Sequence, residues 1–263
     1  MLQRFISRKL LEKVSPSIHK SAVMSSLNPE DSWLADDPPD PKVIQLCGLD
    51  NKAINTARRL LEQGEVIAVP TDTVFGLACD SSNTAAINKL YEIKGRDKSK
   101  PLAICVCAVS EVKKYSKTTY LPKGLLKSLL PGPVTVILER KPRLNPDLNP
   151  GITNVGIRVP GTIWHPFIDF VTSALGQPLA LTSANLSNEP NCIHVEEFKS
   201  LWPKLGGVFD TSINMVDHGW NTAREGSTIV DLTEPGRYRI VRKGLGYDRA
   251  ITKLKKFFLE EVE

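Results

Sequence analysis

The sequence lacks the patterns that mark several common classes of protein. Its five cysteines are scattered and form no C-x-x-C pair, which disfavours both a zinc ribbon and a disulfide framework. Its four histidines show no metal-ligand spacing, so we expect no metal site built from protein side chains. No run of roughly 18 apolar residues is present, so we expect a soluble protein without a membrane-spanning helix.

Several signatures of nucleotide and hydrolase sites are also missing. The chain contains no G-x-x-x-x-G-K-[ST], no G-x-S-x-G and no H-E-x-x-H, which excludes the P-loop, the hydrolase elbow and the zinc protease helix as their usual motifs. Gly244-Leu245-Gly246 lacks the third glycine and the strand-to-helix setting of a dinucleotide site.

Positive charge is concentrated at the start of the chain. The net charge is +5, of which residues 1–27 carry +4 and residues 28–263 only +1. Binding along a nucleic-acid backbone needs a basic domain or a dense basic stripe. The nearly neutral body therefore disfavours general nucleic-acid binding.

Residues 1–41 are predicted to be a leader and a linker. Residues 1–20 mix apolar, basic and serine residues with one acid, a composition typical of a mitochondrial transit peptide; the alternative is a disordered start without a targeting role. Residues 36–41 hold three prolines and favour neither helix nor strand. A start at Met24 would remove most of the basic residues, so we expect both a mitochondrial and a cytoplasmic form.

Residues 42–250 are predicted to form one α/β domain, followed by a tail helix over 251–263. The patterning predicts helices over Asn51–Gln63 and Asn83–Lys94, and strands over Val43–Leu46, Val66–Val69, Leu102–Cys107, Val134–Leu138, Val155–Val159, Leu179–Leu181, Thr228–Val230 and Tyr238–Val241. Strands interleaved with helices indicate an α/β fold with some parallel pairing. The long connection over residues 141–154 is either a functional lid or a surface excursion.

Polar residues at strand ends are the first candidates for a binding site. Thr71 and Thr73 follow a buried strand directly, where ligands of α/β proteins commonly bind. Taken alone, this segment favours the simpler interpretation of a turn capped by Thr71 or Asp72. Ser183 and Asn185 lie two apart on an extended segment, so their side chains point the same way.

Charged residues are the second group of candidates. Residues 94–100 contain four cations at the end of a helix, where they either serve an anion or are simply solvated. Arg158 lies within an apolar strand; a buried guanidinium needs an acid, or a bound carboxylate or phosphate. A structural ion pair and a ligand site therefore both remain open for Arg158.

Seven short motifs occur in a fixed order along the chain. They are PTDTVFGL (70–77), KGR followed by KPL (94–102), PGPVT (131–135), GIRVP (156–160), TSAN (182–185), STIVD (227–231) and VRKG (241–244). Together they resemble the YrdC family of threonylcarbamoyl-AMP synthases over about residues 42–247. The resemblance implies an α/β fold in which a twisted mixed sheet with flanking helices forms a basic concave groove.

The family resemblance also implies a reaction. It is a nucleotidyl transfer in which L-threonine, bicarbonate and ATP condense to threonylcarbamoyl-adenylate and pyrophosphate. Because both reactants are anions, catalysis rests mainly on charge neutralisation and alignment, and Mg²⁺ enters with ATP. The product feeds the threonylcarbamoyl-adenosine modification of tRNA, so the expected partner is the downstream tRNA threonylcarbamoyl transferase machinery; stable tRNA binding is compatible with the resemblance but not required.

The same resemblance assigns roles to individual residues. The expected ATP-binding residues are Lys94, Arg96, Lys100, Asn185 and Arg242, of which Lys94 and Arg96 are also the expected catalytic residues. The expected threonine-binding residues are Thr73, Arg158, Ser183 and Ser227. Cys105 stands where many relatives carry a histidine that contacts threonine, so that contact is not carried over.

Two alternatives remain at this point. The chain could be a non-catalytic module of the same fold that binds RNA or a nucleotide. It could also be a carbamoyl-transferring relative used in hydrogenase maturation, which normally belongs to a longer chain with zinc-finger-like cysteines that this sequence lacks.

Overall fold

The structure is a computed structural model that describes residues 42–46, 50–95, 97, 100–161, 166–211 and 224–262. From Asp40 onward the chain forms one compact unit. The expected leader and linker, and with them the targeting prediction, lie outside the described residues. Within the described residues, no helix has both the length and the apolar character needed to cross a membrane.

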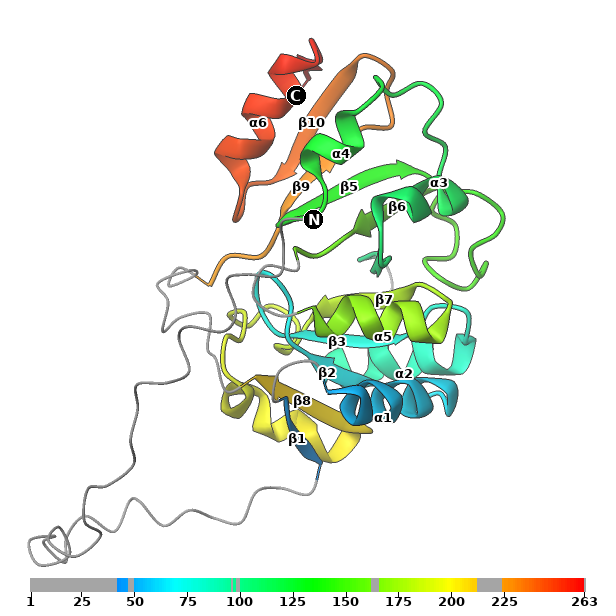
Figure 1. The fold of residues 1–263 in the computed structure, drawn as a ribbon, viewed down its shortest axis with the longest axis vertical. Coiled ribbons are helices and arrows are strands. Elements are labelled where there is room, and N and C mark those ends of the chain that lie inside the picture. Colours follow the sequence, from blue (N-terminus) through cyan, green and yellow to red (C-terminus); the bar gives the residue numbers. More distant parts are fainter. Residues whose placement is uncertain are drawn as a thin grey trace, which may run out of the picture. The chain divides into compact units, whose positions relative to one another are not determined.

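Eleven strands in the described part of the chain form one sheet (Figure 1). They are β1 (Val43–Leu46), β2 (Ile67–Val69), β3 (Gly76–Asp80), β4 (Ala103–Cys105), β5 (Val134–Glu139), β6 (Asn154–Arg158), β7 (Leu179–Ser183), β8 (Gly207–Thr211), β9 (Thr228–Asp231), β10 (Arg237–Arg242) and β11 (Glu260–Glu261). Their spatial order is β1-β8-β2-β3-β7-β4-β6-β5-β9-β10-β11. Elements distant in sequence are therefore neighbours in the sheet.

The sheet mixes parallel and antiparallel pairs. Strand β8 runs parallel to β1 and β2, β4 parallel to β6, and β5 parallel to β9. Strands β3 and β7, β4 and β7, and β5 and β6 pair antiparallel. The predicted α/β fold with a twisted mixed sheet is confirmed. The expected basic character of a groove stays a prediction.

Helices connect many of the strands. They are α1 (Asn51–Glu62), α2 (Thr84–Lys94), α3 (Val112–Tyr115), α4 (Leu125–Leu129), α5 (Phe167–Leu175) and α6 (Tyr247–Lys256), with 3-10 segments η2 (Val109–Glu111) and η3 (Val195–Lys204). The Asn83 side chain caps α2 by accepting from the Ala86 N–H at 3.1 Å. Gly95 ends α2 at a φ of 57°, a conformation that glycine adopts without strain. Lys94 is thereby the last residue of the helix.

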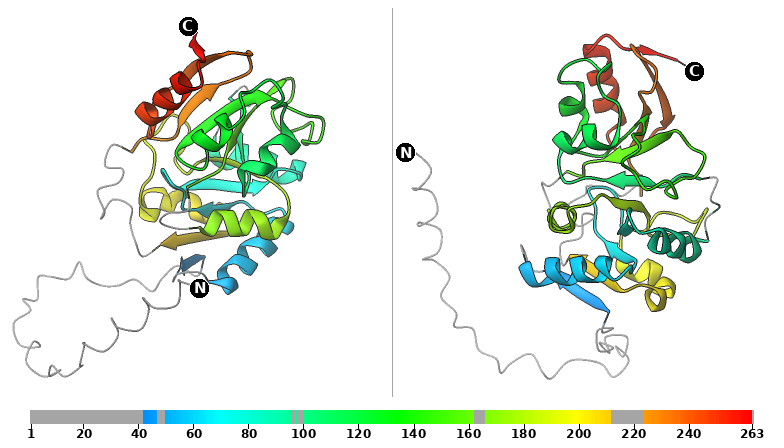
Figure 2. Two further views of the ribbon diagram at one scale, coloured as in Figure 1. Left: turned by 45° about the horizontal axis from the view of Figure 1, so that its top comes forward. Right: turned by 90° about the vertical axis from the view of Figure 1, so that its right-hand side faces the viewer.

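Two apolar cores lie on opposite faces of the sheet. Successive residues of β2 alternate between them, since Ile67 and Val69 belong to one core and Ala68 to the other. The first core is shared with α1 and α5, and the second with α2 and η3. Figure 2 shows α1 and α5 on one side of β1, β8, β2, β3 and β7, with α2 and η3 on the other.

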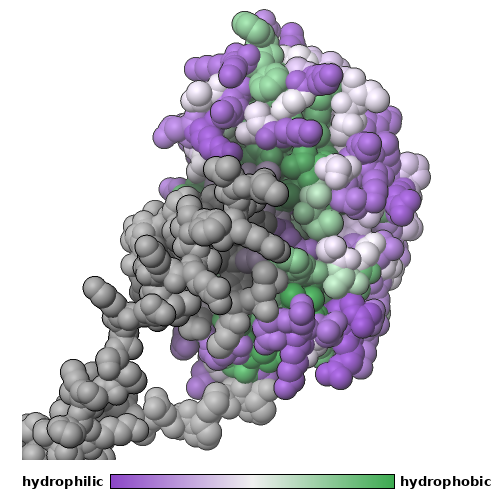
Figure 3. Space-filling model, viewed as in Figure 1, coloured by the Kyte–Doolittle hydropathy of each residue, from purple (hydrophilic) through white to green (hydrophobic). Residues whose placement is uncertain are grey.

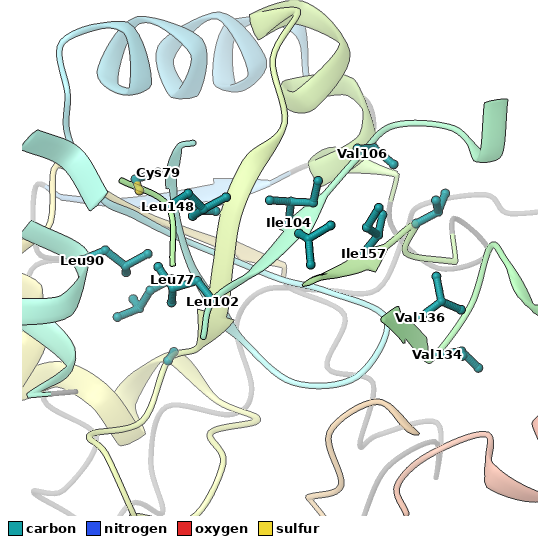
Figure 4. Close-up of a cluster of buried hydrophobic side chains, with 14 of the residues drawn as sticks. Leu77, Cys79, Leu90, Leu102, Ile104, Val106, Val134, Val136, Leu148 and Ile157 are labelled. Atoms are coloured by element: carbon teal, nitrogen blue, oxygen red, sulfur yellow. The ribbon is translucent and has the colours of Figure 1, made fainter. Parts of the chain in front are cut away.

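The larger core extends from α2 to the strands at the other end of the sheet. Figure 4 shows Leu90 of α2, Ile104 of β4, Val136 of β5 and Ile157 of β6 gathered in it. Leu148, from the long connection between β5 and β6, lies in the same cluster and is fully buried. In the view of Figure 3, hydrophilic residues cover most of the described surface, with apolar residues mainly in a narrow strip between them.

The long connection between β5 and β6 is fastened at several points. Arg140 donates to the carbonyl oxygens of Leu148 at 2.6 Å and Asn145 at 2.8 Å. Asn149 is 1% exposed; its amide donates to the Leu102 carbonyl at 2.8 Å and accepts from the Leu102 N–H at 2.8 Å. These contacts hold the segment to the body of the domain, which disfavours both the lid and the loose surface excursion that the sequence left open.

The C-terminal segment differs from the predicted helix over 251–263. Helix α6 begins at Tyr247 and ends at Lys256, and β11 follows it. Gly246 precedes the helix at a φ of 84°, and Phe258 follows it at a φ of 59°. Because left-handed residues cannot continue a right-handed helix, these two positions delimit α6.

Candidate active site

A cavity of about 150 Å³, partly open to solvent, lies on one face of the sheet and is lined by residues of β3, β4, β5, β6, β7, β9 and β10. Its described lining is dominated by hydroxyl groups and arginines. The lining residues are Thr71, Thr73, Val74, Phe75, Gly76, Pro101, Ala103, Thr135, Arg158, Leu181, Thr182, Ser183, Asn191, Gly226, Ser227, Ile229 and Arg242. All four predicted threonine-binding residues and Arg242 lie in this one lining.

The connection between β2 and β3 supplies the first wall of the cavity. Thr71 donates to the Val74 carbonyl at 2.6 Å and accepts from the Thr73 N–H at 3.2 Å. The two threonine hydroxyls lie 3.1 Å apart. The predicted turn capped by Thr71 is therefore present, and the same turn presents both hydroxyls to the cavity.

Arg158, the last residue of β6, forms a buried ion pair with Asp72. The same nitrogen, Nη2, also donates to the Thr73 hydroxyl at 3.1 Å. The other oxygen of Asp72 accepts from the Gly161 N–H at 2.7 Å. Nε of Arg158 is buried without a hydrogen-bond partner among the described residues. The structural ion pair left open by the sequence is thus present, and the guanidinium nevertheless lines the cavity.

Lys94, the last residue of α2, is buried with 2% of its surface exposed, and its side chain lies against the end of β7. Its ammonium donates to the Ser183 carbonyl at 2.6 Å and hydroxyl at 3.1 Å. It also donates to the Asn185 carbonyl and, at 3.1 Å, to the Asn185 side-chain oxygen. Neither Lys94 nor Asn185 is among the described lining residues, so they reach the cavity through Ser183.

The opposite wall is formed around Ser227, just before β9. Arg242 donates from Nε to the Ser227 carbonyl at 3.1 Å, and from Nη2 to the same carbonyl at 2.8 Å. Thr135 of β5 lies with its hydroxyl 2.7 Å from that of Ser227. Gly226 leaves room for the guanidinium, since an added Cβ would lie 2.8 Å from Nη2 of Arg242.

Besides Lys94 and Asn185, two further predicted ATP-binding residues are not among the described lining residues. Arg96 lies outside the described residues. Lys100 is exposed and donates to the Asn188 side chain at 3.0 Å. Their assignment to ATP stays a prediction.

Cys105 and Asp169 lie near the Arg158 ion pair but outside the described lining. Cys105 is fully buried, and this burial raises the pKa of its thiol. Burial, and then the charge of Asp72, raise the pKa of Asp169 to about 7. Oδ1 of Asp169 has no hydrogen-bond partner among the described residues. The protonation of Asp169 is therefore expected to change near neutral pH.

Sequence reasoning missed three polar residues of the site. Asp72 appeared only as a possible turn cap, and Thr135 was one residue of a strand predicted as apolar. Asn191 also lines the cavity and donates to the Arg224 carbonyl at 2.9 Å. Thr135 could have been noticed, because it is a polar residue within an otherwise apolar strand. In the structure it lies beside Gly156, which has no side chain to cover it.

Comparison with known proteins gives consistent matches. A family model described as Sua5_yciO_yrdC, telomere recombination, matches residues 59–244. The chain is 44% identical over 208 residues to threonylcarbamoyl-AMP synthase of Bos taurus, covering 79% of this chain and 74% of that protein. The corresponding Homo sapiens protein is 44% identical over 205 residues, with 78% and 72% covered. The structure of P. abyssi Sua5 complexed with L-threonine matches with a TM-score of 0.69 and 23% identity, covering 84% of this chain and 62% of that chain.

Proposed function

The chain belongs to the Sua5, YciO and YrdC family, and on this premise we propose that it makes threonylcarbamoyl-AMP from L-threonine, bicarbonate and ATP. The observation that carries the proposal is the 44% identity to threonylcarbamoyl-AMP synthases over 208 residues. The cavity supports it independently, since it collects three hydroxyl side chains and two guanidiniums that sequence reasoning had assigned to these substrates.

The reaction proceeds in two steps. The threonine amine nitrogen attacks the carbon of bicarbonate, and loss of water leaves a carbamate. A carbamate oxygen then attacks the α-phosphorus of ATP, the bond from that phosphorus to the bridging oxygen breaks, and pyrophosphate leaves. The enzyme is thereby a nucleotidyltransferase. Both attacking group and target are anionic, so positive charge and alignment lower the barrier more than a general base does.

The threonine side of the site is formed by Arg158 and the hydroxyls around it. A guanidinium meets a carboxylate through parallel hydrogen bonds, and Asp72 holds that of Arg158 in place. Thr73, Ser183 and Ser227 line the same cavity and offer hydroxyl donors to the amino acid. With the carboxylate held in this way, the amine, on which the carbamate forms, faces the nucleotide side of the cavity.

The nucleotide side is formed by Arg242 and by the residues around Lys94. Arg242 lines the cavity, and Arg96, Lys100 and Asn185 contribute to phosphate and nucleotide binding. Lys94 places a buried positive charge beside Ser183 and holds the end of β7 through Asn185. That charge stabilises the transition state of transfer.

Magnesium is proposed to enter as a complex of ATP. The described residues contain no group of three or more histidine, cysteine or acidic side chains able to hold a metal ion. They therefore do not fit a magnesium site built by the protein, and phosphate oxygens are the expected ligands.

The decisive experiment measures pyrophosphate release from ATP by the purified protein. We expect release only when threonine and bicarbonate are both present. A non-catalytic module that binds RNA or a nucleotide would release none. A carbamoyl-transferring relative would release pyrophosphate without a requirement for threonine, and either result would contradict the proposal.

The cellular role is proposed on the same basis. The adenylate passes to the tRNA threonylcarbamoyl transferase machinery, and the protein acts in both mitochondria and cytoplasm. A reporter fused to residues 1–40 tests the location, because a reporter that stays outside mitochondria would contradict the mitochondrial part.

A further inference from the structure

A pair of buried hydroxyl groups joins the two substrate sides of the cavity. Thr135 and Ser227 are 4% and 3% exposed, and their hydroxyl oxygens lie 2.7 Å apart. Both residues line the cavity. Thr135 comes from β5 and Ser227 directly precedes β9, which pairs with β5 in parallel.

The orientation of the Thr135 side chain is fixed by its neighbour on β6. Gly156 lies beside it, and a Cβ added to this glycine would lie 3.2 Å from Cγ2 of Thr135. The methyl group of Thr135 therefore occupies the space above Gly156, while its hydroxyl faces Ser227. Because χ1 of a β-branched residue is restricted, this hydroxyl has little freedom to turn elsewhere.

The Ser227 hydroxyl has two hydrogen-bond partners, Thr135 and Arg242, and in the bond with Thr135 either hydroxyl can donate. A serine hydroxyl donates one hydrogen bond and accepts two. Nη2 of Arg242 donates to the Ser227 hydroxyl oxygen at 3.3 Å, which occupies one acceptor position. If Thr135 donates to the other, both acceptor positions are filled, and the Ser227 proton is left to donate to a molecule in the cavity.

We propose that Thr135 is a positioning residue that donates to Ser227 and so directs the Ser227 hydroxyl proton to the substrate. The inference rests on the proposed function, in which Ser227 contacts threonine. The group recognised is an anionic oxygen of the amino acid, which accepts a hydrogen bond from the Ser227 hydroxyl. Thr135 thus acts on threonine through Ser227, whereas Arg242 ties the same serine to the nucleotide side.

The test compares Thr135→Val with Thr135→Ser in the pyrophosphate-release assay. Valine keeps the shape of threonine but removes the hydroxyl, so we expect the KM for threonine to rise on the order of tenfold while the KM for ATP stays unchanged. Serine keeps the donor, so the KM for threonine should return toward that of the unmodified protein. Thr252→Val, at an exposed position of α6, is the matched control and should change neither constant.

A double variant separates positioning from a structural role. Because Thr135 acts through Ser227, Thr135→Val should add nothing to the threonine KM of Ser227→Ala. Independent multiplication of the two effects, or an unchanged threonine KM in Thr135→Val with normal folding by circular dichroism, would overturn the inference. Absence of threonine-dependent release by the unmodified protein would instead contradict the proposed function.

Discussion

At the residue scale, the guanidinium of Arg158 has two anionic partners. One partner is Asp72, which forms a buried ion pair with the guanidinium, and the other is the substrate carboxylate that we propose it binds. The sequence indicated that Arg158 needs an anionic partner, but it could not identify Asp72, because that acid lies 86 positions away. The pairing of β3 with β7, and of β4 with β7 and β6, brings the two segments together.

Arg158→Lys tests the carboxylate contact. Lysine keeps a positive charge beside Asp72 but lacks the planar fork, so we expect the threonine KM to rise on the order of tenfold and the ATP KM to change little. Arg239→Lys, at an exposed position of β10, is the control. A threonine KM equal to that of the unmodified protein would remove Arg158 from substrate binding.

Lys94→Met tests the buried positive charge at the end of α2. Methionine fills similar space without the ammonium, so we expect kcat to fall on the order of a hundredfold through lost charge stabilisation. Lys89→Met, on the same helix but with a partly exposed side chain paired with Glu65, should retain activity. Circular dichroism distinguishes a folded, slow variant from an unfolded one. A folded Lys94→Met protein with normal kcat would contradict the assignment.

The raised pKa of Asp169 predicts that the stability of the protein depends on pH. Its folded pKa of about 7 lies above the unfolded value of roughly 4, so between these pH values the folded state holds a proton that the unfolded state has lost. Asp169 therefore lowers the free energy of unfolding as the pH rises through this window. Asp169→Asn, which resembles the protonated acid, should match the unmodified protein near pH 4 and be more stable at pH 8.

Urea denaturation at several pH values measures this difference. Asp248→Asn, at an exposed position of α6, is the matched control and should show no comparable trend. A stability difference between Asp169→Asn and the unmodified protein that stays constant from pH 4 to pH 8 would show that Asp169 does not titrate there.

At the element scale, strongly periodic segments could be predicted and short buried ones could not. Helix α1 and helix α2 begin within one residue of their predicted starts, because caps and apolar spacing mark them locally. Strands β3 and β8 were missed. Strand β3 continues directly from the turn at Thr71–Phe75, and its small residues, such as Gly76 and Ala78, carry no strand propensity of their own. Their place in the sheet comes from tertiary pairing.

The connection from Arg140 to Thr153 belongs with these elements because it is held by specific contacts. Asn149, at a φ of 55°, bonds both backbone groups of Leu102 and so fixes the entry to β4, where Pro101 and Ala103 line the cavity. Its side-chain oxygen also accepts from the Tyr91 hydroxyl of α2 at 3.2 Å. The segment therefore supports one wall of the cavity.

Asn149→Gly tests this support. Glycine keeps the left-handed backbone but removes both bonds to Leu102, so we expect the free energy of unfolding to fall by about 2–4 kcal/mol. Asn145→Gly, which removes a half-buried amide from the same segment, should cost less. Equal losses in the two variants would contradict the support role, and a large change in amide exchange of Leu148 on ligand addition would indicate a lid instead.

At the scale of the whole molecule, the cavity assembles residues from most of the chain. Thr73, Arg158, Ser183, Ser227 and Arg242 were predicted from separate motifs, and one cavity contains all five. Their types and motif order could be recognised in the sequence. Their distances could not, because strand order β7-β4-β6-β5-β9-β10 results from long-range pairing that no local pattern encodes.

We propose that this cavity holds threonine and ATP together. The most direct measurement is a crystal structure of the protein with L-threonine and an ATP analogue whose α,β-bridge resists cleavage. We predict the threonine carboxylate within hydrogen-bond distance of Arg158 and the α-phosphate on the side of Arg242. Ligands bound on another surface, or a threonine that does not contact Arg158 or the hydroxyls beside it, would contradict the claim.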